Sequence, residues 1–406
     1  MININTTPKF KTVRMQLSFL AEPTKKEMSA RAVLINMMKQ QTKTYPTKAK
    51  LLNHLHERYN MRLSALPSKI GRVQMLSFTI DFIHSNYTLE DNDMMTDAIE
   101  VLESIIKEPL LTEKLFKQEQ RILEEYFDSI YADKSHYAVL SMLKHMYKDP
   151  INHIDGLGDK EDVKSLIYED ILNAYHHLFD GQVICTVHGD VDEQKTHDLV
   201  TNHFSFLDKQ SIDYSFTVKN QERSQGQEII ETQNIKQTNL VLGLHMPIYF
   251  DDQDYLKARF LNVILGGHSE SMLFKEIREK HHMAYYVSSS YDPYQGLLLI
   301  QTGIDAKNKE QVLSLIKKTL KNMQTGTIRE TVFEQSRKQL RNALIQSQDS
   351  QARLTNQATL ASLFKIDYSV EQRLLELQAF TKEDIATLSK EILLDTIYVL
   401  TGDQHE

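Results

Sequence analysis

The chain has 406 residues, of which 41% are hydrophobic and 25% are charged, a balance typical of a folded protein with two ordinary domains or a single large one. Its formal net charge is −8 and both signs are mixed along the chain, which argues against nucleic acid as the main partner. No apolar run approaches the roughly 20 residues of a membrane-spanning helix, and the single cysteine, Cys185, excludes an intrachain disulfide framework and favours a reducing, cytoplasmic location.

In the first half of the chain, the spacing of apolar residues switches between the period of a strand and the period of a helix. The alternation is clearest at 73–83, where Leu76, Phe78, Ile80 and Phe82 share one face. In chain order, the pattern predicts a strand at 13–19, helices at 25–40 and 47–59, a hairpin of 61–66 and 73–83, helices at 91–107, 112–131, 137–147 and 169–179, and a strand at 183–188.

The second half repeats this order after residues 207–227, which hold no sustained period and are interpreted as a linker. It predicts a strand at 239–246, helices at 252–265 and 271–280, a hairpin of 285–291 and 296–303, helices at 307–323, 329–348 and 381–392, and a strand at 398–400. A repeat of this length indicates a duplicated domain. We therefore predict an α+β protein of two homologous domains, residues 1–206 and 228–406, in a clamshell arrangement. Each domain is expected to be an antiparallel sheet with helices packed on one side.

The stretch 265–289 contains the residues on which a function can be argued. Gly266 and Gly267 end an apolar run, a short helical stripe follows, and a β-rich run begins at Tyr285. Arg278 lies late on the predicted helix, so a tight turn could direct Arg278 and Tyr285 towards the same space. An arginine and a tyrosine near a turn are most often a surface ion pair and a half-buried ring, so the pattern alone does not specify a site.

This stretch resembles the second-domain pattern of the M16 (insulinase- or pitrilysin-type) metallopeptidases in their two-domain form. The similarity is carried by Leu273-Phe274-Lys275-Glu276-Ile277-Arg278-Glu279-Lys280 and by Met283-Ala284-Tyr285, and the duplicated order of elements extends it over the whole chain. Residues 31–66 further resemble the family members associated with 5-aminopentanol modification of elongation factor P. The pattern departs from the family at His282, where the family has a glycine at a helix end, a position that often needs a positive φ.

The resemblance also identifies the helix that binds zinc in active members, through a His-x-x-Glu-His motif on the first helix of the first domain. Two His side chains at that spacing can bind Zn²⁺ while the Glu activates a water molecule. In this chain the aligned positions hold Ala32, Ile35 and Asn36, so we expect this zinc site to be lost. The family's distant Glu ligand has Glu124 or Glu125 as its counterpart, and neither holds a metal alone.

By this resemblance, the chain is expected to be the zinc-less subunit of a heterodimeric peptidase, with no cofactor of its own and with Zn²⁺ in a homologous partner. Arg278 and Tyr285 would contact the carbonyl of a peptide substrate and stabilise its oxyanion, and Gly266 and Gly267 would approach the peptide backbone. Two alternatives remain: a non-catalytic scaffold that binds a peptide or protein, and an enzyme acting alone through a site that its motifs do not reveal. Neither nucleic acid nor a membrane is an expected partner.

Overall fold

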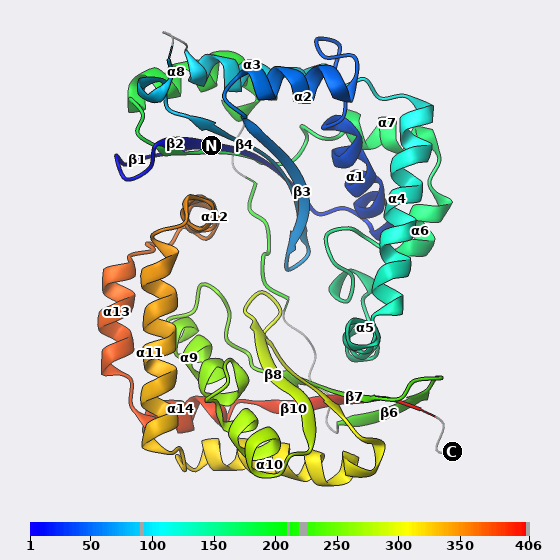
Figure 1. Ribbon diagram of the computed structural model, residues 1–406, viewed down its shortest axis with the longest axis vertical. Helices are drawn as coiled ribbons and strands as arrows, with labels where there is room; N and C mark the ends of the chain where they lie inside the picture. The colour runs from blue at the N-terminus through cyan, green and yellow to red at the C-terminus, as the bar shows by residue number, and fades with distance from the viewer. Residues whose placement is uncertain (90–92, 209–211, 219–225, 403–406) are drawn as a thin grey trace. The chain divides into compact units, whose positions relative to one another are not determined.

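The computed structural model describes residues 1–89, 93–208, 212–218 and 226–402 (Figure 1). Its first half contains β1 (Ile2–Thr6), β2 (Thr12–Ala21), α1 (Lys25–Met38), α2 (Lys48–Glu57), β3 (Arg62–Ile70), β4 (Val73–Ile83), α3 (Met94–Lys107), α4 (Glu113–Ala132), α5 (Lys134–Met146), α6 (Lys160–Ser165), α7 (Tyr168–His176), β5 (Val183–Gly189) and α8 (Glu193–His203). Its second half contains β6 (Gln227–Thr232), β7 (Thr238–His245), α9 (Tyr255–Gly266), the π-helix η4 (Phe274–Lys280), β8 (Ala284–Asp292), β9 (Leu297–Ile304), α10 (Lys309–Gln324), α11 (Glu330–Ser347), α12 (Gln351–Phe364), α13 (Val370–Ala379), α14 (Lys382–Ser389) and β10 (Leu393–Thr401).

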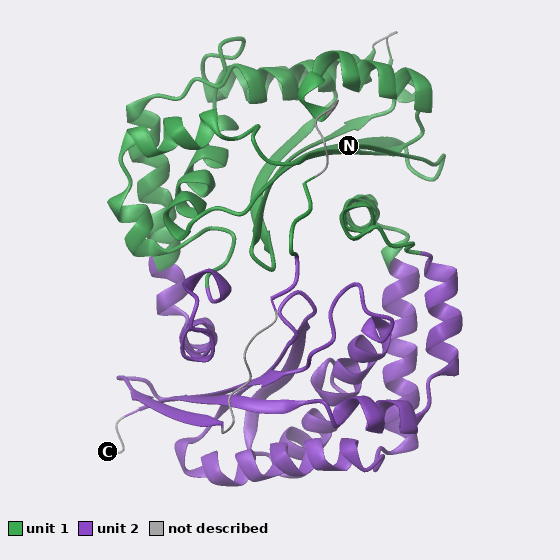
Figure 2. Ribbon diagram, turned by 180° about the vertical axis from the view of Figure 1, so that it is seen from behind, with its two compact units in different colours: residues 1–127, 154–215, 347–368 green, residues 128–153, 216–346, 369–406 purple. Residues whose placement is uncertain are grey.

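The structure divides into two compact units, and each unit takes one segment from the other half of the sequence (Figure 2). The first unit is Met1–Phe127, Ile154–Ser215 and Ser347–Tyr368, and the second is Asp128–His153, Phe216–Gln346 and Ser369–Glu406. The exchanged segments carry α5 and α12, each of which follows the long helix of its half. The ranges 1–206 and 228–406 therefore remain a prediction about the repeat. Within the predicted linker, residues 209–211 and 219–225 lie outside the described residues.

The first unit is built on a five-stranded sheet with the order β1-β5-β2-β4-β3. Alternation in β2 and β4 places Leu17, Phe19 and Phe78 in the core, where the rings of Phe19 and Phe78 meet edge to face at 5.8 Å. The transferred helix α12 packs against β5. There the hydroxyls of Thr186 and Thr359 lie 2.9 Å apart, because a polar group buried beneath a helix requires a partner.

The second unit repeats this architecture with the order β6-β10-β7-β9-β8. The transferred helix α5 packs on β7 and β10, where Met142 is fully buried against the same face as Val241 and Tyr398. Gly243 makes this close approach possible, because a Cβ there would lie 2.6 Å from the sulfur of Met142. Leu242 alternates with these positions and is also fully buried, so both faces of β7 are covered.

The predicted α+β class is confirmed, and the long predicted helices and strands are present. The sheets are mixed, since β1 and β6 pair in parallel with β5 and β10 while the remaining pairs are antiparallel. Neither parallel edge strand was predicted, because residues 2–6 and 227–232 are short segments rich in polar residues. None of the helices in the described ranges is both long and apolar enough to cross a membrane.

Candidate functional site

The predicted site residues lie in the second unit, between the end of α9 and the start of β8. The helix predicted at 271–280 is present, but from Phe274 to Lys280 its hydrogen bonds follow the π-helical pattern. π-Helical turns are rare and are frequent at functional sites, where the extra residue changes the direction of the side chains. Ile277 is fully buried and anchors η4, while the next residue, Arg278, is exposed.

The turn from η4 into β8 passes through His282, whose φ is 54°. The following N–H, that of Met283, donates to the Ile277 carbonyl at 3.1 Å and closes the end of the helix. Glycine adopts a positive φ without steric cost, whereas histidine does so less readily. His282 thus adopts, at some steric cost, the left-handed backbone that a glycine adopts freely.

Tyr285 lies at a β-bulge at the beginning of β8, the edge strand of its sheet. Ala284 pairs with Ile304 and Tyr286 pairs with Gly303, so the register skips Tyr285. Its side chain is 61% exposed, and its hydroxyl donates to Asp305 Oδ1 at 2.9 Å. This hydrogen bond to a carboxylate raises the pKa of Tyr285, which keeps the hydroxyl protonated and able to donate.

The neighbouring Tyr286 has a structural role, so its hydroxyl is not available to bind a substrate in place of the Tyr285 hydroxyl. Its hydroxyl lies 2.9 Å from Asn239 Oδ1 and 3.1 Å from Ser135 Oγ, so it connects β8 to β7 and to the transferred helix α5. Burial raises the pKa of Tyr286. The expectation that the two tyrosines point to different sides of the strand agrees with these separate partners.

Arg278 presents an exposed guanidinium whose contact is with the face of the Phe274 ring, 5.0 Å from the ring centroid. Within the described residues its guanidinium has no ion pair or hydrogen bond. The fold thus brings Arg278 and Tyr285 onto one short segment without joining them by a hydrogen bond. Both donors face solvent, where an external carbonyl oxygen can reach them.

Gly266 and Gly267 have different surroundings. Gly266 is buried, and a Cβ there would lie 2.7 Å from the backbone nitrogen of Ser289, so its small size lets α9 approach β8 closely. Gly267 is exposed and ends α9 with an ordinary φ of −78°. Contact of either glycine with substrate stays a prediction, and the packing of α9 on β8 accounts for Gly266.

The three positions aligned with the zinc motif lie on α1 in the first unit, and the loss of the zinc site stays a prediction. Ala32 and Ile35 are fully buried in the core, and the Asn36 amide oxygen accepts a hydrogen bond from Lys39 Nζ at 2.8 Å. These side chains do not fit a zinc ion, because two of them offer no donor atom and the third is already occupied. Within the described residues, no group of three or more His, Cys, Asp or Glu side chains is placed to hold a metal ion.

Near the C-terminal end of α1, the buried carboxylate is that of Glu119, which the sequence did not single out. Glu119 is 3% exposed and accepts a hydrogen bond from Gln40 Nε2 at 3.2 Å. Burial raises the pKa of Glu119 and lowers that of Lys39, while each charge partly offsets the shift of the other. The predicted candidates are half-buried (Glu124) and exposed (Glu125).

Beside Lys39 a cavity of about 750 Å³ opens between α1, α2 and the start of β3. Its floor is apolar, with Leu51, Leu55 and Met61, and its rim carries the cations Lys48 and Arg62. The first unit thus contains a cavity near the positions of α1 that align with the zinc motif.

Comparison with known proteins identifies the family. Residues 165–340 match the profile of the Peptidase M16 inactive domain. The probable inactive metalloprotease YmfF of Bacillus subtilis is 28% identical over 408 residues, spanning 99% of this chain and 96% of that protein. A conserved protein from Enterococcus faecalis V583 has a solved structure with a TM-score of 0.92 and 28% identity, covering 100% of this chain and 97% of that one.

A peptidase M16 inactive domain from Pseudomonas fluorescens shares the fold, with a TM-score of 0.82 at 16% identity over 99% of this chain and 95% of that one. The profile match lies mostly in the second half of the chain, and the relatives cover its full length. The chain is therefore similar over its full length to inactive, metalloprotease-like members of the M16 peptidase family.

Proposed function

We propose that this chain is the zinc-less subunit of a paired M16-type peptidase and contributes Arg278 and Tyr285 to a peptide held by a zinc-bearing homologue. One observation carries the proposal: two exposed donors are presented by a segment with an unusual backbone. The π-helix η4, the positive φ of His282 and the bulge at Tyr285 occur within twelve residues, counted from 274 to 285. Backbone strain of this kind persists where the surrounding structure enforces it, and it clusters at functional sites.

The chemistry of the two donors fits stabilisation of an oxyanion. In the partner, a bound Zn²⁺ would polarise the peptide carbonyl and activate a water molecule. Arg278 has a permanent charge and free N–H groups, and Tyr285 has a hydroxyl that stays protonated at neutral pH. To bind a peptide carbonyl, the Tyr285 hydroxyl would donate to the carbonyl oxygen instead of to Asp305. The hydroxyl would therefore donate one hydrogen bond both before and after the peptide binds.

The second candidate function is a non-catalytic scaffold that holds a peptide or protein. It is favoured by the hydrogen bond between Tyr285 and Asp305, because the hydroxyl already has a partner in the free chain. Under this alternative, the activity of any partner is indifferent to substitutions at Arg278 and Tyr285. The two candidate functions therefore predict different rates of peptide cleavage for the pair that contains an Arg278 or Tyr285 variant.

The experiment is co-expression of this chain with a zinc-bearing M16 homologue from the same cell, followed by a peptide-cleavage assay on the purified pair. Arg278→Ala is compared with Arg341→Ala, which removes another exposed arginine, from α11. We expect the Arg278 variant to lose activity by about 10²–10³-fold, the usual effect of removing one oxyanion donor, while the control keeps it. Failure of the two chains to associate, or equal activity of the two variants, would overturn the proposal.

A further inference from the structure

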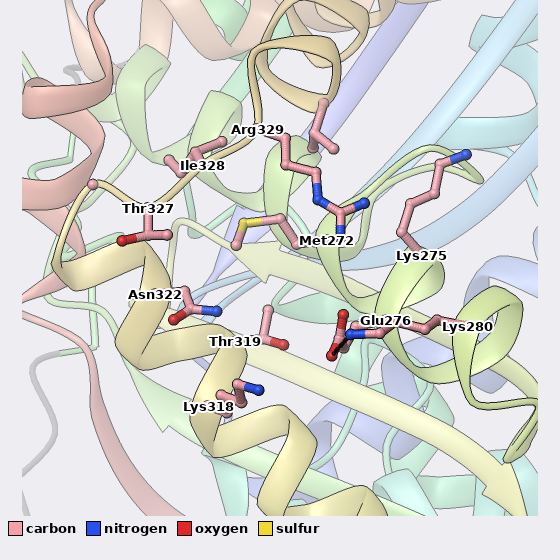
Figure 3. Close-up of a pocket in the computed structure, with 12 residues that line it drawn as sticks. Met272, Lys275, Glu276, Lys280, Lys318, Thr319, Asn322, Thr327, Ile328 and Arg329 are labelled. Carbon is pink, nitrogen blue, oxygen red and sulfur yellow. Dashed lines mark hydrogen bonds and ion pairs between the residues drawn. The ribbon is translucent and has the colours of Figure 1, made fainter.

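The second unit contains a cavity of about 400 Å³ with a strongly basic lining (Figure 3). Its walls are η4 with the preceding turn, the C-terminal half of α10, and residues 326–332 at the start of α11. The charged side chains that line it are Lys275, Lys280, Lys318, Arg329 and Glu276. Four cations and one carboxylate give a formal charge of +3 (4 − 1), in a chain whose net charge is −8.

Two of the four cations are already neutralised by neighbouring carboxylates. Lys280 Nζ lies 2.9 Å from Glu276 Oε1, and Lys275 Nζ lies 2.7 Å from Glu270 and 3.0 Å from Glu279. Lys318 and Arg329 differ from these, because across the ranges that the structure describes their side chains form no ion pair or hydrogen bond. The positive charge available to a ligand is therefore that of Lys318 and Arg329.

The two free cations lie on facing walls of the cavity, and an amide lies beside one of them. In Figure 3, Lys318 and Asn322 extend from α10, and the Arg329 guanidinium, which extends from the start of α11, lies in this view between Met272 and Lys275. Lys318 and Asn322 are four residues apart on one helix, so their side chains share a face. Asn322 is half-buried, and its side-chain amide has no partner among the described residues.

The base of Arg329 is held firmly, which limits the entropy lost when a ligand binds. The Thr327 N–H donates to the Asn322 carbonyl at 2.8 Å, and Ile328 is only 5% exposed. These contacts fix the short connection between α10 and α11. A site whose donors are positioned beforehand binds more tightly than one that must order them.

We propose that this cavity binds a multivalent oxyanion of the phosphate class. The planar guanidinium of Arg329 can contact two oxygens, the Lys318 ammonium supplies a second charge, and the Asn322 amide supplies a neutral donor. The volume lies within the range of small-molecule sites and suits a diphosphate. Glu276 marks the edge of the anion position, because its carboxylate repels an anionic ligand. The ion pair with Lys280 neutralises part of that negative charge.

Occupation of the cavity would act on η4, because Glu276 and Lys280 belong both to its lining and to the helix that carries Arg278. An oxyanion that draws Lys280 away from Glu276 changes the contacts of η4 on the cavity side. This consequence rests on the proposed function, whereas binding of the anion itself does not.

The test is calorimetric titration of the full chain with pyrophosphate, repeated with inorganic phosphate at the same ionic strength. The double variant Lys318→Gln, Arg329→Gln is compared with the double variant Lys317→Gln, Arg341→Gln, which removes two exposed cations from the same helices outside the cavity. We expect saturable binding of one pyrophosphate per chain, tighter than that of phosphate. The cavity variant should bind at least about tenfold more weakly, and the control should bind as the unaltered chain does.

A further variant, Glu276→Gln, removes the one carboxylate of the lining and should tighten binding. If circular dichroism shows that the double variant of the cavity is misfolded, the affinity of the Glu276→Gln variant tests the proposed site instead. Absence of saturable binding, equal weakening in the two double variants, or weaker binding by the Glu276 variant would overturn the inference. Because no partner chain or peptide is present, this result is independent of whether the proposed peptidase function holds.

Discussion

The adjacent tyrosines of β8 provide a sharp test, because Tyr285→Phe and Tyr286→Phe each remove one hydroxyl and nothing else. The Tyr285 hydroxyl is exposed and bonds to the carboxylate of Asp305, so its loss should leave the stability of the folded chain unchanged. In the complex with a zinc-bearing partner, the same change should lower kcat by about 10²–10³-fold, because an oxyanion donor acts chiefly in the transition state. KM should change little.

The Tyr286 variant should behave in the opposite way. Its hydroxyl lies within hydrogen-bonding distance of Asn239, which is 4% exposed, and of Ser135 on α5. Two such contacts at about 0.5–1.5 kcal/mol each predict a loss of about 1–3 kcal/mol in the free energy of unfolding. Activity per folded molecule should stay close to that of the unaltered pair.

Urea unfolding of the isolated chain and steady-state peptide cleavage by the pair measure the two effects separately. The reasoning predicts a crossed pattern, in which one variant loses rate and the other loses stability. It is refuted if Tyr286→Phe lowers kcat as much as Tyr285→Phe, or if Tyr285→Phe leaves kcat intact.

Three further changes test the local structure. His282→Gly should raise the free energy of unfolding by about 0.5–1 kcal/mol, because glycine relieves the left-handed backbone; urea unfolding measures it. Gly266→Ala should lower it by about 1–3 kcal/mol, because the new methyl group would lie 2.7 Å from the Ser289 backbone; the same method applies, with Ser290→Ala as an exposed control. Burial lowers the pKa of His188, whose ring nitrogens have no partner within the described chain, so stability should fall as the pH drops below about 6.5. His188→Leu should reduce the slope of the unfolding free energy against pH by the equivalent of up to about one proton taken up on unfolding. Unfolding measured between pH 5 and 7 gives this slope.

The direction of the pH effect follows from proton linkage. A base whose pKa is lower in the folded state than in the unfolded state binds its proton preferentially when the chain unfolds. The stability is therefore complete above the unfolded pKa and is lost as the pH falls through it. An unchanged pH dependence in His188→Leu, or an equal change in a variant of the exposed His197, would contradict this assignment. A destabilised His282→Gly or an unaffected Gly266→Ala would contradict the other two.

Local pattern predicts those parts of the fold whose burial is periodic. The alternation of large apolar residues that ends in Phe19 and Phe82 identifies β2 and β4, although most residues on both faces of these strands are buried. β1 and β6 escape detection because a parallel edge strand depends on backbone pairing with β5 and β10, and such pairing leaves no mark in a five- or six-residue polar segment. The sequence also did not predict that α5 and α12 each pack in the unit formed mainly by the other half of the chain. An amphipathic pattern predicts that a helix has a buried face, but it does not indicate which sheet covers that face.

In the candidate site, too, the sequence predicted some features and missed others. The resemblance singled out Arg278, Tyr285 and the aligned positions on α1, and their roles stay predictions. It also marked His282 as a departure from the family's glycine, and the structure shows a positive φ there. The π-helical bonding of η4, which packs against β8 and α10, and the bulge at Tyr285, which lies in the pairing of β8 with β9, have no periodic signature in the sequence, so periodicity predicted an ordinary helix and strand. Glu119 was missed because a buried glutamate on an amphipathic helix cannot be distinguished by sequence from its solvated neighbours.

The central claim, that this chain completes the active site of another subunit, is tested most directly by adding it to the purified zinc-bearing homologue. The single-turnover rate of peptide cleavage is measured with the unaltered chain and with the Arg278→Ala, Tyr285→Phe double variant, and association is followed by gel filtration. The account predicts that both forms bind the homologue and that only the unaltered chain raises the cleavage rate. Equal stimulation by the two forms, with both bound, would contradict it.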